Sequence, residues 1–315
     1  MANEHQVVRS KNLKFFNMKR FLKILIGLIG VIILVIFGFR VYFQVWKTSA
    51  EKNLPKNSVV FESSQGAIEY FTVGDNTNPV LVIHGTPGSV FVNMLFYDVL
   101  SEAGLSMVSL SRPGYYQTPL SSGKTIKEQS KLYKLLLDEL GIESVFVFGI
   151  SGGGPSAIQF ALDYPERCKG LILAAALTQK ISLIGDGHII NMLYSNEFLL
   201  WLATQGMAMS ARDKVTRDGM QTYFKTGFFP FKFASQGYYN DVSTFEDLEL
   251  NLTALEVPVL LIHGTMDEAV PFLFSENAHQ LIPNSTLILI DGTGHFDVAH
   301  NEMAQTALNE FVRKD

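Results

Sequence analysis

Residues 149–157 read GISGGGPSA and directly follow the apolar run SVFVF. Within them, Gly149, Ser151 and Gly153 match the pattern G-x-S-x-G. In a sharp turn between a buried strand and a helix, this pattern holds the serine on a strained corner with its hydroxyl exposed. The flanking glycines leave the space that such a turn needs. Ser151 is therefore a candidate nucleophile.

A serine hydroxyl is a weak nucleophile at neutral pH and needs a base, most often histidine. Of the seven histidines, His84, His263 and His295 follow predicted strands directly. His295 lies in the stretch DGTGH after the last predicted strand, and it comes later in the chain than Ser151. The chain order serine, acid, histidine favours His295 as the base. We expect the other histidines to have no catalytic role.

The base needs a carboxylate that holds its tautomer and stabilises the imidazolium. Residues 263–271, HGTMDEAVP, place Asp267 in the loop after the predicted strand 257–264. Glu268 is the neighbouring alternative, but the following AVP favours an inward Asp267 and a solvent-facing Glu268. Strands that follow each other in sequence are usually neighbours, so we expect Asp267 to lie beside His295.

The oxyanion that develops during attack on a carbonyl needs N–H donors that are already in place. Gly152, the residue after the candidate nucleophile, is the first predicted donor. The loop HGTPGS, at residues 84–89, is expected to supply the second donor. Pro87 has no N–H, so Thr86 is the candidate in this loop.

The elements that must position these residues alternate along the chain from residue 58 onward. Apolar stretches such as 79–85, 144–150 and 257–264 favour buried strands of a parallel sheet with helices on both faces. Residues 58–63 and 67–74 predict an antiparallel hairpin. Helices are predicted over residues 91–104, 125–141, 155–165, 271–282 and 301–314. Catalytic groups in such sheets lie at the carboxyl ends of the strands, which is where the candidate residues fall.

Residues 178–250 interrupt this alternation. The segment is rich in Met, Phe, Tyr and Leu, has a largely helical pattern, and is too long for a loop in a compact domain. We predict a cap over residues 178–250, inserted into a core formed by residues 58–177 and 251–315. Its aromatic residues would either line a substrate pocket or form the cap's own small core.

The N-terminal part of the chain has a different character. Residues 21–39 are apolar apart from Lys23. At about 1.5 Å per residue, such a helix approaches the roughly 30 Å thickness of the hydrocarbon layer. Tyr42 and Trp46 suit a membrane interface. We predict a transmembrane signal anchor over residues 21–46, with a cleaved signal peptide as the alternative.

The flanks of the predicted anchor are polar. Residues 1–20 form a basic tail and residues 47–57 a linker. Six basic residues lie at the N-terminal side of the apolar stretch and four follow it. This distribution favours a single-pass protein of the cell membrane with a cytoplasmic N-terminus and an extracytoplasmic catalytic domain.

The composition of the whole chain excludes two further features. The net charge of -5 argues against a nucleic-acid partner. The single cysteine, Cys168, excludes an internal disulfide.

Taken together, residues 58–315 resemble the α/β-hydrolase superfamily. The resemblance rests on HGTPGS, SRPGYYQT, GISGGG, HGTMDEAVP and GTGH, in the family's order. It implies a mostly parallel sheet flanked by helices, an inserted cap, and no metal or organic cofactor. The site that it implies is a triad with an oxyanion hole: Ser151, Asp267 and His295, with Gly152 and Thr86. HGTPG and SRPGYYQT also resemble proline iminopeptidase-like members and hydrolases of aromatic-degradation products.

Three functions follow as expectations. The first is a membrane-anchored serine hydrolase that cleaves a small-molecule or lipid ester through an acyl-enzyme. The second is an aminopeptidase of the proline iminopeptidase type, in which acidic residues of the cap bind an amino group. The candidates for that role are Glu197, Asp213, Glu246, Asp247 and Glu249. The third is a non-catalytic binding protein on the same scaffold.

Overall fold

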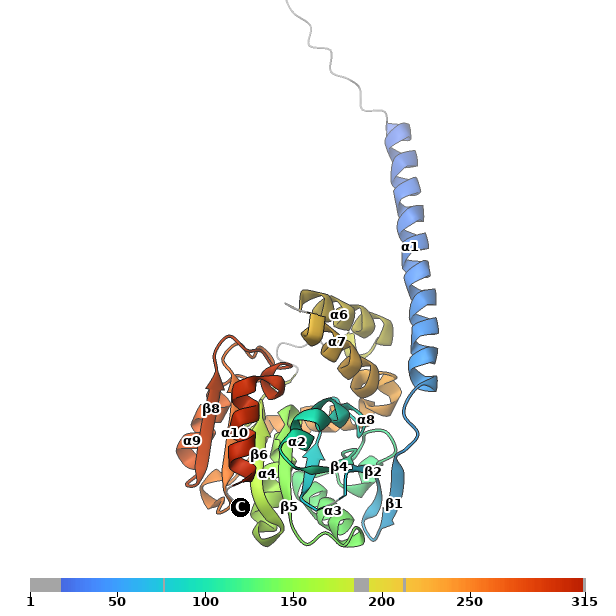
Figure 1. Ribbon diagram of the computed structural model, residues 1–315. Helices are drawn as coiled ribbons and strands as arrows, with labels where there is room; N and C mark the ends of the chain where they lie inside the picture. The colour runs from blue at the N-terminus through green and yellow to red at the C-terminus, as the bar shows by residue number, and fades with distance from the viewer. Residues whose placement is uncertain (1–17, 76, 184–192, 212–213, 314–315) are drawn as a thin grey trace, which may run out of the picture. The chain divides into compact units, whose positions relative to one another are not determined.

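The computed structural model describes residues 18–75, 77–183, 193–211 and 214–313 (Figure 1). The chain separates into two compact units, Met1–Trp46 and Lys47–Asp315. Helix α1 (Met18–Lys52) forms the described part of the first unit and continues into the second.

Helix α1 is long and apolar enough to cross a membrane, and none of its most apolar window is buried in the protein. A signal sequence near the N-terminus meets the same criteria. The transmembrane anchor over residues 21–46 therefore stays a prediction. The first 17 residues of the predicted basic tail lie outside the described residues.

The second unit is built on an eight-stranded sheet in the order β1-β2-β4-β3-β5-β6-β7-β8. The strands are β1 (Val59–Ser63), β2 (Gly66–Val73), β3 (Pro79–Ile83), β4 (Ser106–Leu110), β5 (Val145–Ile150), β6 (Cys168–Ala174), β7 (Val259–Gly264) and β8 (Ser285–Ile290). Strands β1 and β2 form an antiparallel hairpin, and β2 pairs antiparallel with β4. All other neighbouring strands are parallel. This arrangement confirms the predicted mostly parallel sheet.

Helices cover both faces of the sheet. They are α2 (Tyr97–Glu102), α3 (Ile126–Glu139), α4 (Gly154–Asp163), α9 (Leu273–Leu281) and α10 (Glu302–Val312). In β3, Leu81 and Ile83 belong to the core with α3, α4 and α9, whereas Val80 and Val82 belong to the core with α2 and α10. Alternate side chains of a strand point to opposite faces of the sheet, so an apolar strand packs against the helices on both faces.

One predicted helix differs from the structure. The sequence predicts a single helix over residues 91–104, but the chain forms a 3₁₀ turn over Val92–Phe96 before α2 begins. The buried Asn93 amide donates to the Val82 carbonyl oxygen at 3.0 Å and to the Ser109 hydroxyl at 2.9 Å. These bonds tie the turn to the sheet, so the prediction of one continuous helix is wrong here.

Residues 178–250, called the cap segment below, lie between β6 and β7 in the chain. Their described elements are helical: α6 (Glu197–Ser210), α7 (Lys214–Tyr223), a π turn (Phe224–Phe228) and α8 (Ser235–Glu246). Figure 1 shows α6 and α7 beyond one end of the sheet rather than against its faces. Residues 184–192 and 212–213 lie outside the described residues. The boundaries of the cap and of the core stay predictions.

Candidate active site

Ser151 stands at the turn between β5 and α4. Its backbone φ is +50°, in the left-handed region that a non-glycine residue adopts only when its surroundings enforce it. A Cβ on Gly149 would lie 2.6 Å from the Cβ of Ala157, and one on Gly153 would lie 2.3 Å from the carbonyl oxygen of Ile83. Helix α4 and the sheet thus approach too closely for side chains at these two positions, which accounts for both glycines.

His295 and Asp267 come from the loops that follow two adjacent strands. Strands β7 and β8 are parallel neighbours, so these loops emerge at the same edge of the sheet. His295 Nδ1–H donates to Asp267 Oδ2 over 2.7 Å. The Asp267 side chain is fully buried, whereas Glu268 is exposed. The bond fixes the tautomer of His295 and leaves its Nε2 as a proton acceptor.

The charge of Asp267 is held by several donors. Its Oδ1 accepts the N–H groups of Ala269 and Val270, each at 2.8 Å. Burial acts to raise the pKa of Asp267, but hydrogen bonds from His263 and His295, the charge of His295 and the Val270 N–H outweigh it and hold this pKa well below its usual value. Asp267 is therefore ionised wherever His295 can act as a base.

His263 follows a predicted strand, but its contact with Asp267 was not predicted from the sequence. It is fully buried at the end of β7, and its Nε2 faces Asp267 Oδ2 at 3.2 Å and the Val270 carbonyl oxygen at 3.0 Å. The Ser275 hydroxyl, 2.6 Å from Nδ1, donates to that nitrogen, which assigns the remaining proton to Nε2. His263 thus helps to hold Asp267. Its position four residues before Asp267 in HGTMD is the signal that could have indicated this contact.

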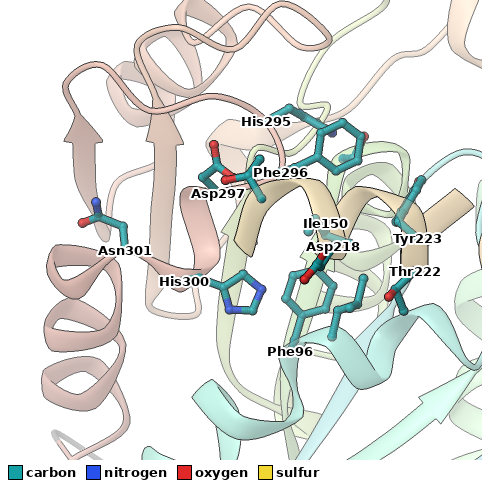
Figure 2. Close-up of a pocket in the computed structure, with 15 residues that line it drawn as sticks. Phe96, Ile150, Asp218, Thr222, Tyr223, His295, Phe296, Asp297, His300 and Asn301 are labelled. Carbon is teal, nitrogen blue, oxygen red and sulfur yellow. The ribbon is translucent and has the colours of Figure 1, made fainter. Parts of the chain in front are cut away.

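Ser151 and His295 line one cavity of 550 Å³ (Figure 2). Its apolar lining residues are Leu95, Phe96, Ile150, Tyr223 and Phe296. Figure 2 shows Thr222 and Tyr223 reaching it from α7 in the cap segment, while Phe96 and Ile150 come from the core. Within the described residues, no hydrogen bond joins Ser151 to His295. Catalytic contacts of this kind often tighten only when a substrate binds.

The two predicted oxyanion donors lie beside Ser151. A Cβ on Gly85 would lie 3.4 Å from Ser151 Oγ, so the HGTPGS loop passes next to the hydroxyl. A Cβ on Gly152 would lie 2.1 Å from Thr86 Oγ1, so these two residues are in direct contact. In the part of the chain that the structure describes, the Thr86 N–H donates to no protein group. It therefore remains a candidate donor.

The acidic residues considered as amino-group ligands are placed elsewhere. Glu197 forms an ion pair with Lys47, and Glu246 accepts a hydrogen bond from Ser182. Neither they nor Asp247 and Glu249 line the cavity that contains Ser151. Asp213 lies outside the described residues. The acids that do line the cavity, Asp218 and Asp297, were not predicted for this role.

Comparisons with known proteins identify the fold and the family of this chain. Residues 78–301 match the family described as the alpha/beta hydrolase fold. An uncharacterised hydrolase of Bacillus subtilis, YcgS, is 30% identical over 266 residues, which cover 76% of this chain and 92% of the relative. A proline iminopeptidase of Clostridioides difficile is 23% identical over 77% of this chain and 93% of its own length. The solved structure of an esterase from Exiguobacterium antarcticum shares the fold, with a TM-score of 0.66 and 20% identity over 81% of this chain and 99% of that chain.

Ser151 lies on a strained turn after the parallel strand β5. Asp267 and His295 form a hydrogen-bonded pair after β7 and β8, which lie two and three strands further along the sheet. This arrangement defines a class of hydrolytic folds. The family match covers most of the second unit and includes all three of these residues. The chain belongs to the α/β-hydrolase family, and its relatives include hydrolases such as YcgS.

Proposed function

We propose that this chain is a membrane-anchored serine hydrolase that cleaves carboxylic esters through an acyl-enzyme. The observation that carries the proposal is the 2.7 Å bond between His295 and Asp267 at a cavity that also contains Ser151 on its strained turn. In this proposal Ser151 is the nucleophile, His295 the base and Asp267 the acid that orients the base.

The reaction proceeds in two halves. His295 Nε2 takes the Ser151 proton as Oγ bonds to the carbonyl carbon, and the N–H groups of Thr86 and Gly152 hold the negative oxygen. The bond to the alcohol then breaks, and His295 gives its proton to the leaving oxygen. A water next attacks the acyl carbon while His295 takes one of its protons. His295 returns that proton to Ser151 as the carboxylic acid leaves.

The lining of the cavity and the N-terminal helix support a lipid-derived ester as the substrate. Leu95, Phe96 and Phe296 offer apolar surface to an acyl or alkyl chain. The proposed anchor over residues 21–46 would hold the enzyme at a bilayer, with the N-terminus cytoplasmic and the catalytic domain outside. The cap segment would close over the bound ester.

The direct test is ester turnover by the full-length chain in detergent micelles. We expect hydrolysis of short p-nitrophenyl esters, and we expect Ser151→Ala to reduce it to the background rate because no nucleophile remains. The folded state of this variant is checked by its thermal unfolding. Hydrolysis that survives in Ser151→Ala at a rate near that of the parent would contradict the mechanism.

An amide is the second candidate substrate. Asp297 lines the cavity and offers a carboxylate to an amino group, whereas Asp218, which also lines it, is paired with Lys214; one relative is a proline iminopeptidase. Prolyl p-nitroanilide assayed beside the esters separates the two cases, because turnover of the amide alone would favour the peptidase. A folded protein that turns over neither, and that a fluorophosphonate does not label, would instead favour a binding protein.

A further inference from the structure

Asp241 on helix α8 of the cap segment is a buried carboxylate whose partners all belong to the core. Its Oδ1 accepts from Arg112 Nη2 at 2.6 Å. Its Oδ2 accepts from Arg112 Nη1 at 3.0 Å, from the Tyr115 hydroxyl at 2.6 Å and from the Thr86 hydroxyl at 2.5 Å. Asp241, Arg112 and Tyr115 are all buried. The cap segment is thus tied by a charged pair to the loop that carries a proposed oxyanion donor.

The Thr86 side chain has a single orientation in this network. Its Oγ1 accepts from Arg112 Nη1 at 3.2 Å and donates to Asp241. The same oxygen lies against the Cα of Gly152, because a Cβ there would come within 2.1 Å of it. The Thr86 hydroxyl therefore sets the distance between Thr86 and Gly152, the two residues whose N–H groups are the proposed donors.

Helix α8 also reaches the second donor residue. Phe245 lies one helical turn after Asp241, so the two side chains share a face of α8. Phe245 is fully buried, and a Cβ on Gly152 would lie 3.2 Å from its Cε2. One face of α8 thus touches Thr86 through Asp241 and Gly152 through Phe245.

We propose that Asp241 and Phe245 are positioning residues that set the separation and direction of the Thr86 and Gly152 N–H groups. Through them the cap segment contributes to stabilising the transition state as well as to binding the substrate. An oxyanion hole works because its donors are fixed in place before the charge develops. This inference rests on the proposed function, in which Thr86 and Gly152 are the donors.

The test compares two neighbouring residues of α8 in the full-length chain. Asp241→Asn keeps the shape of the side chain but replaces one acceptor oxygen by a donor. We expect kcat for p-nitrophenyl butyrate to fall roughly ten- to a hundred-fold, less than the 10²–10³ that loss of a whole donor costs, with KM changed by less than about threefold. Affinity for butylboronic acid, whose adduct on serine is tetrahedral and charged, should fall by a similar factor.

The matched control is Asn240→Ala. Asn240 also ties α8 to the core, by donating to the Lys124 carbonyl oxygen at 2.9 Å, but it touches neither donor residue. We expect thermal stability to fall in this variant while kcat and boronate affinity stay within about twofold of the parent. An equal fall of kcat in Asn240→Ala would overturn the inference, because any loosening of the cap would then have the same effect.

Phe245→Leu gives an independent measurement if Asp241→Asn does not fold, because it leaves the ion pair intact. It should lower kcat and boronate affinity together, again with little change in KM. Parent values of both quantities in either folded variant would overturn the positioning role while leaving the proposed function intact. A wild-type chain with no esterase activity and no boronate binding would overturn both.

Discussion

At the scale of single residues, the site depends on how three side chains are held. Ser151 is held by the turn between β5 and α4, which keeps its backbone at a φ of +50°. His295 is fixed by its 2.7 Å bond to Asp267, and Asp267 is fixed by two backbone N–H groups and by His263. His263 and the two N–H groups orient Asp267, and Asp267 orients His295, so loss of an outer member should change how His295 is presented to Ser151.

Replacing Asp267 by Asn should lower kcat by about 10⁴, because an amide stabilises the wrong tautomer of the histidine and cannot stabilise the imidazolium. The measurement is kcat for a p-nitrophenyl ester near pH 7.5. Glu268→Gln is the matched control, since Glu268 is the exposed neighbour, and it should leave kcat unchanged. A loss of less than tenfold in Asp267→Asn would contradict the assigned role.

Asp267 should also make the fold sensitive to acid. The pKa of Asp267 is lower in the folded chain than in the unfolded chain. Its ionised form therefore stabilises the fold fully at pH values above its unfolded pKa of about 3.9. This contribution is lost progressively as the pH falls below that value. Urea unfolding at pH 5 and pH 3 should show a smaller loss of stability for Asp267→Asn than for the parent. An equal loss in both proteins would show that Asp267 is not the group responsible.

The sequence indicates the candidate site residues whose signal is local. Ser151, Gly152 and the flanking glycines share one motif, and His295 and Asp267 each follow a recognisable strand. Asp241 could not be found in this way. Its partners Thr86 and Arg112 are far from it in sequence, and the contacts depend on how α8 packs on the core. Asp218 was missed because its place at the cavity depends on how α7 packs, whereas Asp297, two residues after His295, carries no signal that separates it from an ordinary loop residue.

At the scale of elements, strands such as β3, β5 and β7 were predicted well because their apolar runs are continuous and a glycine lies at or close to their ends. The hairpin β1–β2 and the parallel pairing of β7 with β8 both follow from the order of these runs. The 3₁₀ turn over Val92–Phe96 was not predictable from periodicity, because side-chain bonds from Asn93 to the sheet decide its form.

The close packing of α4 on the sheet makes a prediction for Gly153. Gly153→Ala would place a methyl group 2.3 Å from the Ile83 carbonyl oxygen, which is backbone and cannot easily move. We expect the free energy of unfolding to fall by about 1–3 kcal/mol, together with a loss of activity as Ser151 shifts. Chemical denaturation measures the first effect and ester turnover the second.

Gly206 in α6 is the matched control for that substitution. Nothing lies within 4 Å of a Cβ at this position, which is inside a helix. Gly206→Ala should therefore raise the free energy of unfolding by up to about 1 kcal/mol, since alanine favours the helix more than glycine does. Equal effects of the two substitutions would argue against a tight turn at Gly153.

At the scale of the whole molecule, the chain has two compact units with different characters. The unit Met1–Trp46 contains the apolar part of α1, and the unit Lys47–Asp315 contains every candidate active-site residue. The predicted anchor and the candidate active site thus belong to different units.

Removing residues 1–46 should therefore release the protein from membranes without abolishing its chemistry. We expect the full-length chain to stay in the membrane pellet after carbonate extraction, because its apolar helix is long enough to span the bilayer. The shortened chain should be soluble and should hydrolyse short, water-soluble esters with a kcat similar to that of the parent. A full-length chain that is recovered in soluble form, shortened at its N-terminus, would instead indicate a cleaved signal sequence.

The most direct test of the central claim is to map where a fluorophosphonate reacts with the folded full-length chain. The probe forms a covalent bond only with a serine that a neighbouring base activates. We predict one adduct per chain, located by peptide mass spectrometry on Ser151, absent from Ser151→Ala and strongly reduced in His295→Ala. Ester turnover without an adduct on Ser151, or an adduct on another residue, would contradict the assignment of Ser151 as the nucleophile.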